Sequence, residues 1–95
     1  MDERSFFLLA YDIADDRRRL KIALLMESLG ERVQGSVFEA YLKPAELEKL
    51  VRKAGRVMKA EEDSLRIYAL CRACRTRIRT VGSARVTPPP QVQVI

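Results

Sequence analysis

The chain has 95 residues, of which 47% are hydrophobic and 33% charged, with a formal net charge of +5. This length and composition fit one small globular domain, and no apolar run of about 18 residues is long enough to span a membrane. The sequence has no histidine, which excludes imidazole as a general base or a metal ligand. Any bound metal is therefore expected to be Mg or Mn, held by oxygen ligands.

The N-terminus does not have the pattern of a signal peptide. Arg4 precedes an apolar run that leads directly into Asp12 without a small-residue cleavage site. We therefore expect a cytoplasmic protein with no membrane association, whose two cysteines are reduced. Cys71 and Cys74 form a single CxxC motif, and two thiols without further ligands are a weak basis for redox chemistry or zinc binding. We expect this pair to pack at a strand end.

The positive charge is concentrated in the last third of the chain. Residues 1–62 carry twelve basic and twelve acidic groups, whereas residues 63–95 carry six arginines and only Asp63. Guanidinium groups bind phosphate oxygens in a bidentate manner, so this excess favours a nucleic-acid partner. A solvated basic face is the alternative.

Residues 6–19 predict a buried strand followed at once by a basic helix. The apolar run at residues 6–10 is too short for a helix and is typical of a strand covered on both faces. Asp12 follows the run, and Asp15 or Asp16 is expected to cap a helix that extends to about residue 29. Arginines at residues 17–19 oppose the helix macrodipole, so we expect them to face an anion.

The remaining pattern predicts two more strands, a second helix and a last strand. Residues 32–34 and 36–42 are expected to be strands joined at Gly35, with a single bent strand as the alternative. Pro44 opens a helix with one apolar face, formed by Leu47, Leu50, Val51, Ala54 and Met58. Residues 63–70 alternate as a strand.

The resulting order, β-α-β-β-α-β, predicts an α+β protein with a ferredoxin-like fold. One antiparallel sheet then carries both helices on the same face. Because the first strand is apolar on both sides, the other sheet face needs a cover, and a second copy of the chain is expected to provide it. The homodimer is thus predicted to form through the sheet faces.

The C-terminal third is expected to add one strand and a tail. Arg75, Arg77 and Arg79 alternate with smaller residues, which predicts three guanidinium groups along one side of a short extra strand. Residues 87–90 are typical of a polyproline II tether. We assign residues 1–82 to the nucleic-acid-binding domain and residues 83–95 to a C-terminal tail, whose apolar end either docks on the partner protomer or is frayed.

Four segments resemble, in order and spacing, the CRISPR-associated Cas2 family of small spacer-acquisition proteins. They are YDI (11–13), DDRRRLK (15–21), RVQGSVFE (32–39) and DSLRIYALCRAC (63–74). The resemblance implies a ferredoxin-like homodimer in which the late strand crosses to the other subunit and Asp12 of each chain binds a divalent cation. It maps family residues onto Arg19, Lys21, Arg32 and Phe38. Lys21 departs from the family pattern if the position requires the bidentate guanidinium group of arginine.

Two functions follow from these residues. The first is a metal-dependent endonuclease, acting on RNA or DNA, in which Asp12 is the catalytic residue and the metal ligand, and Arg19 and Arg32 neutralise transition-state charge. The second is a structural adaptor that bridges dimers of the CRISPR integrase on DNA without chemistry. Taken alone, Asp12 is also typical of a turn or cap residue. An RNA-recognition module of the RRM type lacks its aromatic signature here.

In both functions the same basic side chains are expected to contact nucleic acid. They are Arg17, Arg18, Arg19, Lys21, Arg32, Arg72, Arg75, Arg77 and Arg79. Three further residues of the matching segments are assigned supporting roles, namely Tyr11, Ser36 and Phe38. Aromatic residues in a sheet more often form core or dimer contacts than base stacks.

Overall fold

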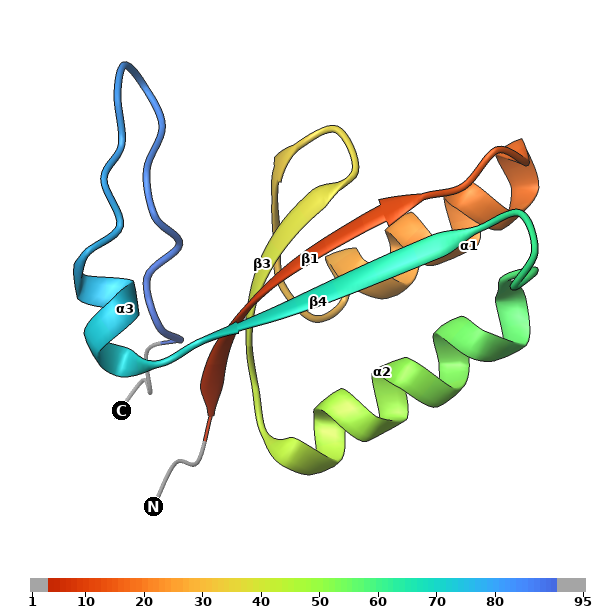
Figure 1. Cartoon of the computed structure of the whole chain (residues 1–95), viewed down its shortest axis with the longest axis horizontal. Coiled ribbons are helices and arrows are strands. Elements are labelled where there is room, and N and C mark those ends of the chain that lie inside the picture. The colour runs from red at the N-terminus through yellow and green to blue at the C-terminus, as the bar shows by residue number, and fades with distance from the viewer. Residues whose placement is uncertain (1–3, 91–95) are drawn as a thin grey trace, which may run out of the picture.

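An antiparallel sheet of four strands, with two long helices on one face, forms most of the computed structural model, which describes residues 4–90 (Figure 1). The elements are β1 (Ser5–Asp12), α1 (Asp16–Glu27), β2 (Glu31–Gln34), β3 (Val37–Leu42), α2 (Pro44–Val57), β4 (Ser64–Leu70) and a short α3 (Arg72–Thr76). The predicted β-α-β-β-α-β order is thus confirmed. None of the helices within residues 4–90 is long and apolar enough to cross a membrane.

The strand order in the sheet is β2-β3-β1-β4, and every neighbouring pair is antiparallel. This is the ferredoxin-like arrangement expected from the sequence. β1 lies between β3 and β4, so Leu9 pairs with Phe38 on one side and with Ile67 on the other. The connection from β2 to β3 is a tight turn in which Gly35 has a φ of +38°, a backbone conformation that favours glycine.

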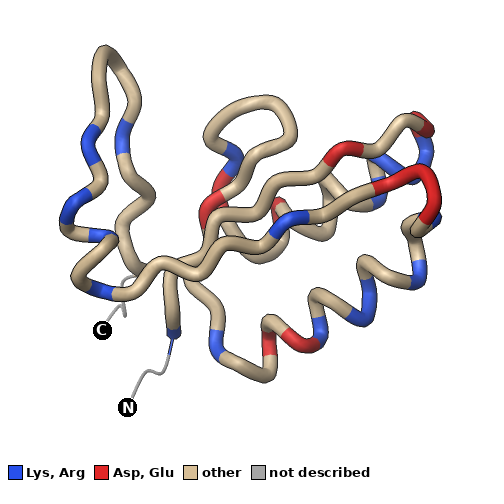
Figure 2. Tube along the Cα trace, viewed as in Figure 1, with Lys and Arg blue, Asp and Glu red and all other residues tan. Residues whose placement is uncertain are grey.

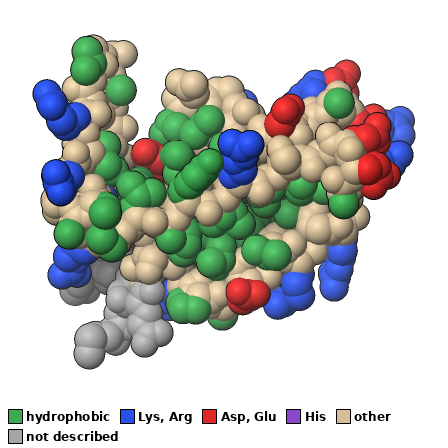
Figure 3. All heavy atoms as spheres, viewed as in Figure 1, with side chains coloured by type: hydrophobic (Ala, Val, Ile, Leu, Met, Phe, Trp, Pro, Cys, Tyr) green, Lys and Arg blue, Asp and Glu red, His purple; other side chains and the backbone are tan. Residues whose placement is uncertain are grey.

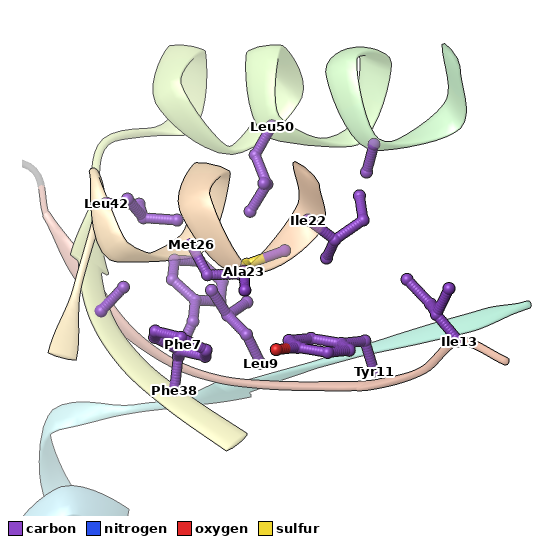
Figure 4. Close-up of a cluster of buried hydrophobic side chains, with 12 residues drawn as sticks. Phe7, Leu9, Tyr11, Ile13, Ile22, Ala23, Met26, Phe38, Leu42 and Leu50 are labelled. Atoms are coloured by element: carbon purple, nitrogen blue, oxygen red, sulfur yellow. The ribbon is translucent and has the colours of Figure 1, made fainter. Parts of the chain in front are cut away.

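The core lies between the sheet and the two helices. Alternate residues of β1, namely Phe7, Leu9 and Tyr11, point towards the helices (Figure 4). α1 contributes Ile22, Ala23 and Met26, and α2 contributes Leu50 and Ala54. The predicted apolar face of α2 is confirmed except at Val51, whose side chain is 45% exposed, while Val57 packs against the core in its place.

The opposite face of the sheet, called here the open face, carries neither α1 nor α2, and only its end near Phe6 and Tyr41 is covered, by α3. Leu8 and Ala10 are only half-buried on it, and Tyr68 of β4 is 47% exposed. Hydrophobic side chains gather over the strands in the view of Figure 3. Phe6 is the exception because its ring lies 4.9 Å from that of Tyr41 and is buried.

The predicted extra strand at Arg75, Arg77 and Arg79 is wrong for the described residues. The chain instead enters α3 directly after β4, because the Cys71 thiol accepts a hydrogen bond from the Cys74 amide at 3.3 Å and thereby caps the helix. A strand there would need a reversing turn after Leu70 in order to pair with β4.

Residues 77–86, called here the arm, run away from α3 and return towards the sheet (Figure 1). Thr87 then anchors the chain to β3: its amide donates to the Glu39 carboxylate at 2.9 Å, and its carbonyl accepts from the Tyr41 hydroxyl at 2.9 Å. The segment expected to be a polyproline tether is therefore fixed at its first residue. The apolar chain end, expected to dock or fray, lies outside the described residues.

Candidate functional site

Asp12 is the last residue of β1 and lies opposite Ser64 of β4. Its neighbours Tyr11 and Ile13 point into the core (Figure 4), so the alternation of the strand places Asp12 on the open face. The residue is exposed, and its carboxylate has no hydrogen bond or ion pair among residues 4–90. A buried strand thus ends in an acid that no cation of the described part of the chain neutralises.

Within residues 4–90, Asp12 is not part of a cluster of potential metal ligands. The described residues contain no group of three or more His, Cys, Asp or Glu side chains placed to hold a metal ion. A hard divalent cation needs several oxygen ligands. Asp12 has the right chemistry and is accessible, but it fits such an ion only together with the same residue of a second chain facing it.

Arg18, predicted to contact nucleic acid, is instead part of the fold. Its Nε lies 2.8 Å from Asp63 Oδ2, and its Nη2 lies 3.3 Å from Asp63 Oδ1. The Asp63 side chain is fully buried and also accepts the Lys59 amide at 2.9 Å. The hydrogen bond from Arg18 holds the pKa of Asp63 below its usual value, and the same bond raises the pKa of Arg18. We therefore remove Arg18 from the binding set.

The loop between β1 and α1 is fixed by a cap and by a second arginine. Of the two predicted caps, Asp15 holds the helix start, because its carboxylate accepts the Arg18 amide at 2.9 Å, which lowers the pKa of Asp15. Arg19 donates to the carbonyls of Ile13 at 3.0 Å and Ala14 at 3.3 Å, and it pairs with Asp16. These bonds lock the backbone just beyond Asp12.

A hollow of about 520 Å³ lies between α1 and the β2–β3 turn, and we call it the α1 hollow. It brings together four of the predicted residues, Tyr11, Arg19, Arg32 and Ser36. Asp12 is not among the residues that line it. The hypothesis that Arg19 and Arg32 act on charge beside Asp12 therefore finds no support within one chain.

Arg32 and Phe38 form a pair on the helix side of the sheet. The guanidinium carbon lies 5.1 Å from the centre of the Phe38 ring, and Nη2 is 3.0 Å from Oε1 of Glu27. Phe38 is completely buried and stacks on Tyr11, with ring centres 6.2 Å apart. Neither ring is accessible to a base, so both support the core. The carbonyl of Ser36 accepts the Tyr11 amide at 3.1 Å, which gives Ser36 a structural role as well.

Most arginines of the C-terminal third are exposed cations. Arg72, Arg77 and Arg79 are exposed, and no ion pair within residues 4–90 engages them. Figure 2 shows basic positions on both limbs of the arm. Arg75 differs, because its guanidinium lies 5.5 Å from the centre of the Tyr41 ring and donates to the Tyr41 hydroxyl at 2.9 Å. It fastens α3 to β3.

The structure changes the assignment of three residues, Arg85, Cys71 and Cys74. Arg85 on the returning limb of the arm is exposed and was missed, because the expected tail boundary at residue 83 separated it from the other arginines. Cys71 and Cys74 are both exposed, so the expectation that they pack at a strand end is wrong. Arg17 and Lys21 of α1 remain exposed as predicted.

Comparison with known proteins gives a consistent result. Residues 5–78 match the family model described as CRISPR associated protein Cas2. The chain is 48% identical over 87 residues to the CRISPR-associated endoribonuclease Cas2 1 of Chloroflexus aurantiacus, with 90% of each chain covered. It is 41% identical over 92 residues to the CRISPR-associated endonuclease Cas2 2 of Thermus thermophilus, covering 97% and 98% of the two chains. A chain of a solved structure titled "Partial Cas6-RT-Cas1--Cas2 complex" is similar with a TM-score of 0.78 at 29% identity, covering 96% and 99%.

Proposed function

Because the chain belongs to the CRISPR associated protein Cas2 family, we propose that it serves spacer acquisition as a homodimer that binds nucleic acid and cleaves phosphodiesters with Mg or Mn. The observation that supports this most is the exposed Asp12 carboxylate at the end of a buried strand, which has no hydrogen bond or ion pair among residues 4–90. Such a carboxylate is free to bind a cation.

The open face supports the homodimer. The helices cover one side of the sheet, while Leu8, Ala10 and Tyr68 on the other side remain accessible to solvent. Two chains that pack through this face bury that apolar surface, and the same packing brings the two Asp12 strand ends to one interface. A two-fold axis near β1 would supply the second carboxylate that a single chain lacks.

Each group of this site has a role. A divalent cation held by the two Asp12 carboxylates supplies Lewis-acid polarisation of a phosphoryl oxygen. Arg19 holds the backbone carbonyls after Asp12, so it positions the strand end and reduces the freedom of the carboxylate. Ser64 lies directly opposite Asp12 on β4, which supports a role for its hydroxyl in binding a water or a phosphate oxygen.

Nucleic acid is bound in this proposal by the exposed cations, chiefly Arg72, Arg77, Arg79 and Arg85, with Arg17 and Lys21 of α1. These groups have no carboxylate partner among the described residues, so they retain full charge towards phosphates. Contacts of this kind do not read sequence, and the substrate class is therefore RNA or DNA of any sequence.

The experiment is a divalent-metal titration of nuclease activity on labelled RNA and DNA. Wild-type protein should require Mg or Mn, and Asp12→Asn should be inactive at every metal concentration because the amide lacks the charge that a hard cation needs. Glu48→Gln, which removes one exposed charge from the outer side of α2, is the matched control and should keep full activity. Activity retained in Asp12→Asn would contradict the proposal.

A second candidate function is that of a catalytically inactive adaptor for the CRISPR integrase. The similarity to a chain from a Cas1-containing complex favours it, as does the lack, within residues 4–90, of a group of three or more potential metal ligands. An adaptor needs the dimer and the arginines but not Asp12. If Asp12→Asn supports spacer integration with the integrase subunit as well as wild type does, the adaptor function is the correct one.

A further inference from the structure

Cys71 and Cys74 are placed as a pair at the junction between β4 and α3. Both thiols are exposed and free. The Cys74 amide donates to Cys71 Sγ at 3.3 Å, which aligns the two residues on one turn of backbone. This hydrogen bond, followed by that of the Cys74 thiol, holds the pKa of Cys71 below its usual value, while the interaction with Cys71 raises the pKa of Cys74. The two sulfurs are therefore not equivalent.

Cys71 also opens into a hollow of about 340 Å³ beside α3, called here the α3 hollow. Arg4, Arg72 and Arg75 line it together with Cys71, whereas Cys74 does not. No acidic residue is among the lining residues. Arg4 lies 4.0 Å from the Glu46 carboxylate and Arg75 donates to the Tyr41 hydroxyl, whereas Arg72 is exposed and has no ion pair within residues 4–90. A thiol that lies beside cations and is accessible to small molecules is the setting of reactive cysteines, and Arg72 favours a reactant with carboxylates.

We propose that Cys71 and Cys74 are a redox-active dithiol, in which Cys71 attacks an anionic low-molecular-weight disulfide bound in the α3 hollow and Cys74 resolves the product. The proposed metal site takes no part in this reaction, whereas Arg72 is shared between the α3 hollow and the proposed nucleic-acid interface. The reactant class is that of peptide disulfides with free carboxylates, for which oxidised glutathione is a suitable probe.

The reaction has two displacement steps. The Cys71 thiolate attacks one sulfur of the small disulfide, whose S–S bond breaks, and a thiolate leaves as a mixed disulfide forms on Cys71. Cys74 then loses its proton to solvent and attacks Cys71 Sγ, which expels the second thiolate. The protein loses two electrons and gains one disulfide, and the small disulfide is reduced to two thiols that take up the two protons.

The reaction is tested on the reduced full-length chain with oxidised glutathione, acid quenching and intact-mass analysis. Wild type should convert to an internal disulfide without a lasting adduct, and Cys74→Ser should accumulate one glutathione unit. Cys71→Ser should react with oxidised glutathione at least about tenfold more slowly than Cys74→Ser, because its remaining thiol is the less acidic one. Circular dichroism spectra of the three proteins should coincide, since both thiols are exposed.

The role of the α3 hollow is tested by removing charge first from the protein and then from the small disulfide. Arg72→Gln should slow the reaction with oxidised glutathione several-fold but leave the reaction with uncharged hydroxyethyl disulfide unchanged. Arg52→Gln on α2 is the control of equal charge and should change neither rate. A persistent adduct on wild type, or equal rates for the two cysteine variants, would overturn the dithiol assignment. An equal effect of Arg72→Gln on both disulfides would overturn the role of the hollow.

Discussion

The arm is the place where charge removal should weaken nucleic-acid binding most cleanly. Arg77 and Arg79 are exposed and have no ion-pair partner within residues 4–90, so their replacement by Gln leaves no carboxylate unpaired. Each phosphate contact contributes about 0.9 to the slope of log K against log salt, so the double variant should lower that slope by about 1.8 for each arm that contacts a duplex. At 0.1 M salt this corresponds to about 60-fold weaker binding, and the difference should fade towards 1 M.

The assay is fluorescence anisotropy with a labelled duplex at several salt concentrations. The control is Arg52→Gln with Lys53→Gln, which removes the same charge from the exposed side of α2. It changes the net charge equally but should lower the slope far less, because a general loss of charge acts only through the screened long-range field. Equal slopes for both double variants would refute the arm as a contact surface and would leave net charge as the explanation.

Three further predictions concern the site and its support. Asp12→Asn should keep the thermal midpoint and DNA affinity of wild type without metal, and a misfolded variant in circular dichroism would instead identify Asp12 as a turn residue. Asp63 has a lowered pKa in the fold, so its pairing with Arg18 stabilises the protein above a pH of about 4 and is lost as the pH falls further; melting between pH 6 and pH 3 should show a smaller fall for Asp63→Asn than for wild type. A Cβ on Gly30 would overlap the Glu39 carbonyl oxygen of β3, so Gly30→Ala should cost about 1–3 kcal/mol in chemical denaturation. Gly55→Ala, with nothing within 4 Å of its Cβ, should instead stabilise α2 by about 0.5–1 kcal/mol.

The fold was predictable because its signals are local. The continuous apolar run at residues 6–10, the glycine at the β2–β3 turn and Pro44 at the start of α2 each specify an element without knowledge of the rest. The failed element has a local cause too. At residues 75–79 alternation favoured a strand, but the thiol cap at Cys71 lies four residues earlier and commits the chain to a helix.

The candidate site was only partly predictable because its contacts join distant segments. Arg18 and Asp63 are 45 residues apart, and nothing near either residue in the sequence marks them as a pair. Arg75 and Tyr41 are likewise 34 residues apart. The position of Asp12 at a strand end, in contrast, was predictable from the sequence, whereas its lack of a hydrogen bond or ion pair among residues 4–90 is seen only in the folded chain.

Two groups of arginines are therefore distinguished, those bonded within the fold and those exposed to solvent. Arg18, Arg19 and Arg75 are used internally: they fix the start of α1, the backbone after Asp12 and the attachment of α3 to β3. The exposed arginines stand on the elements that these bonds hold in place. A count of basic residues thus overestimates the phosphate contacts, since removal of an internal arginine should lower stability first and affinity only through it. Thermal melting beside the salt slope separates the two groups, because Arg18→Gln should shift the midpoint with little change in slope, and the arm variants should do the reverse.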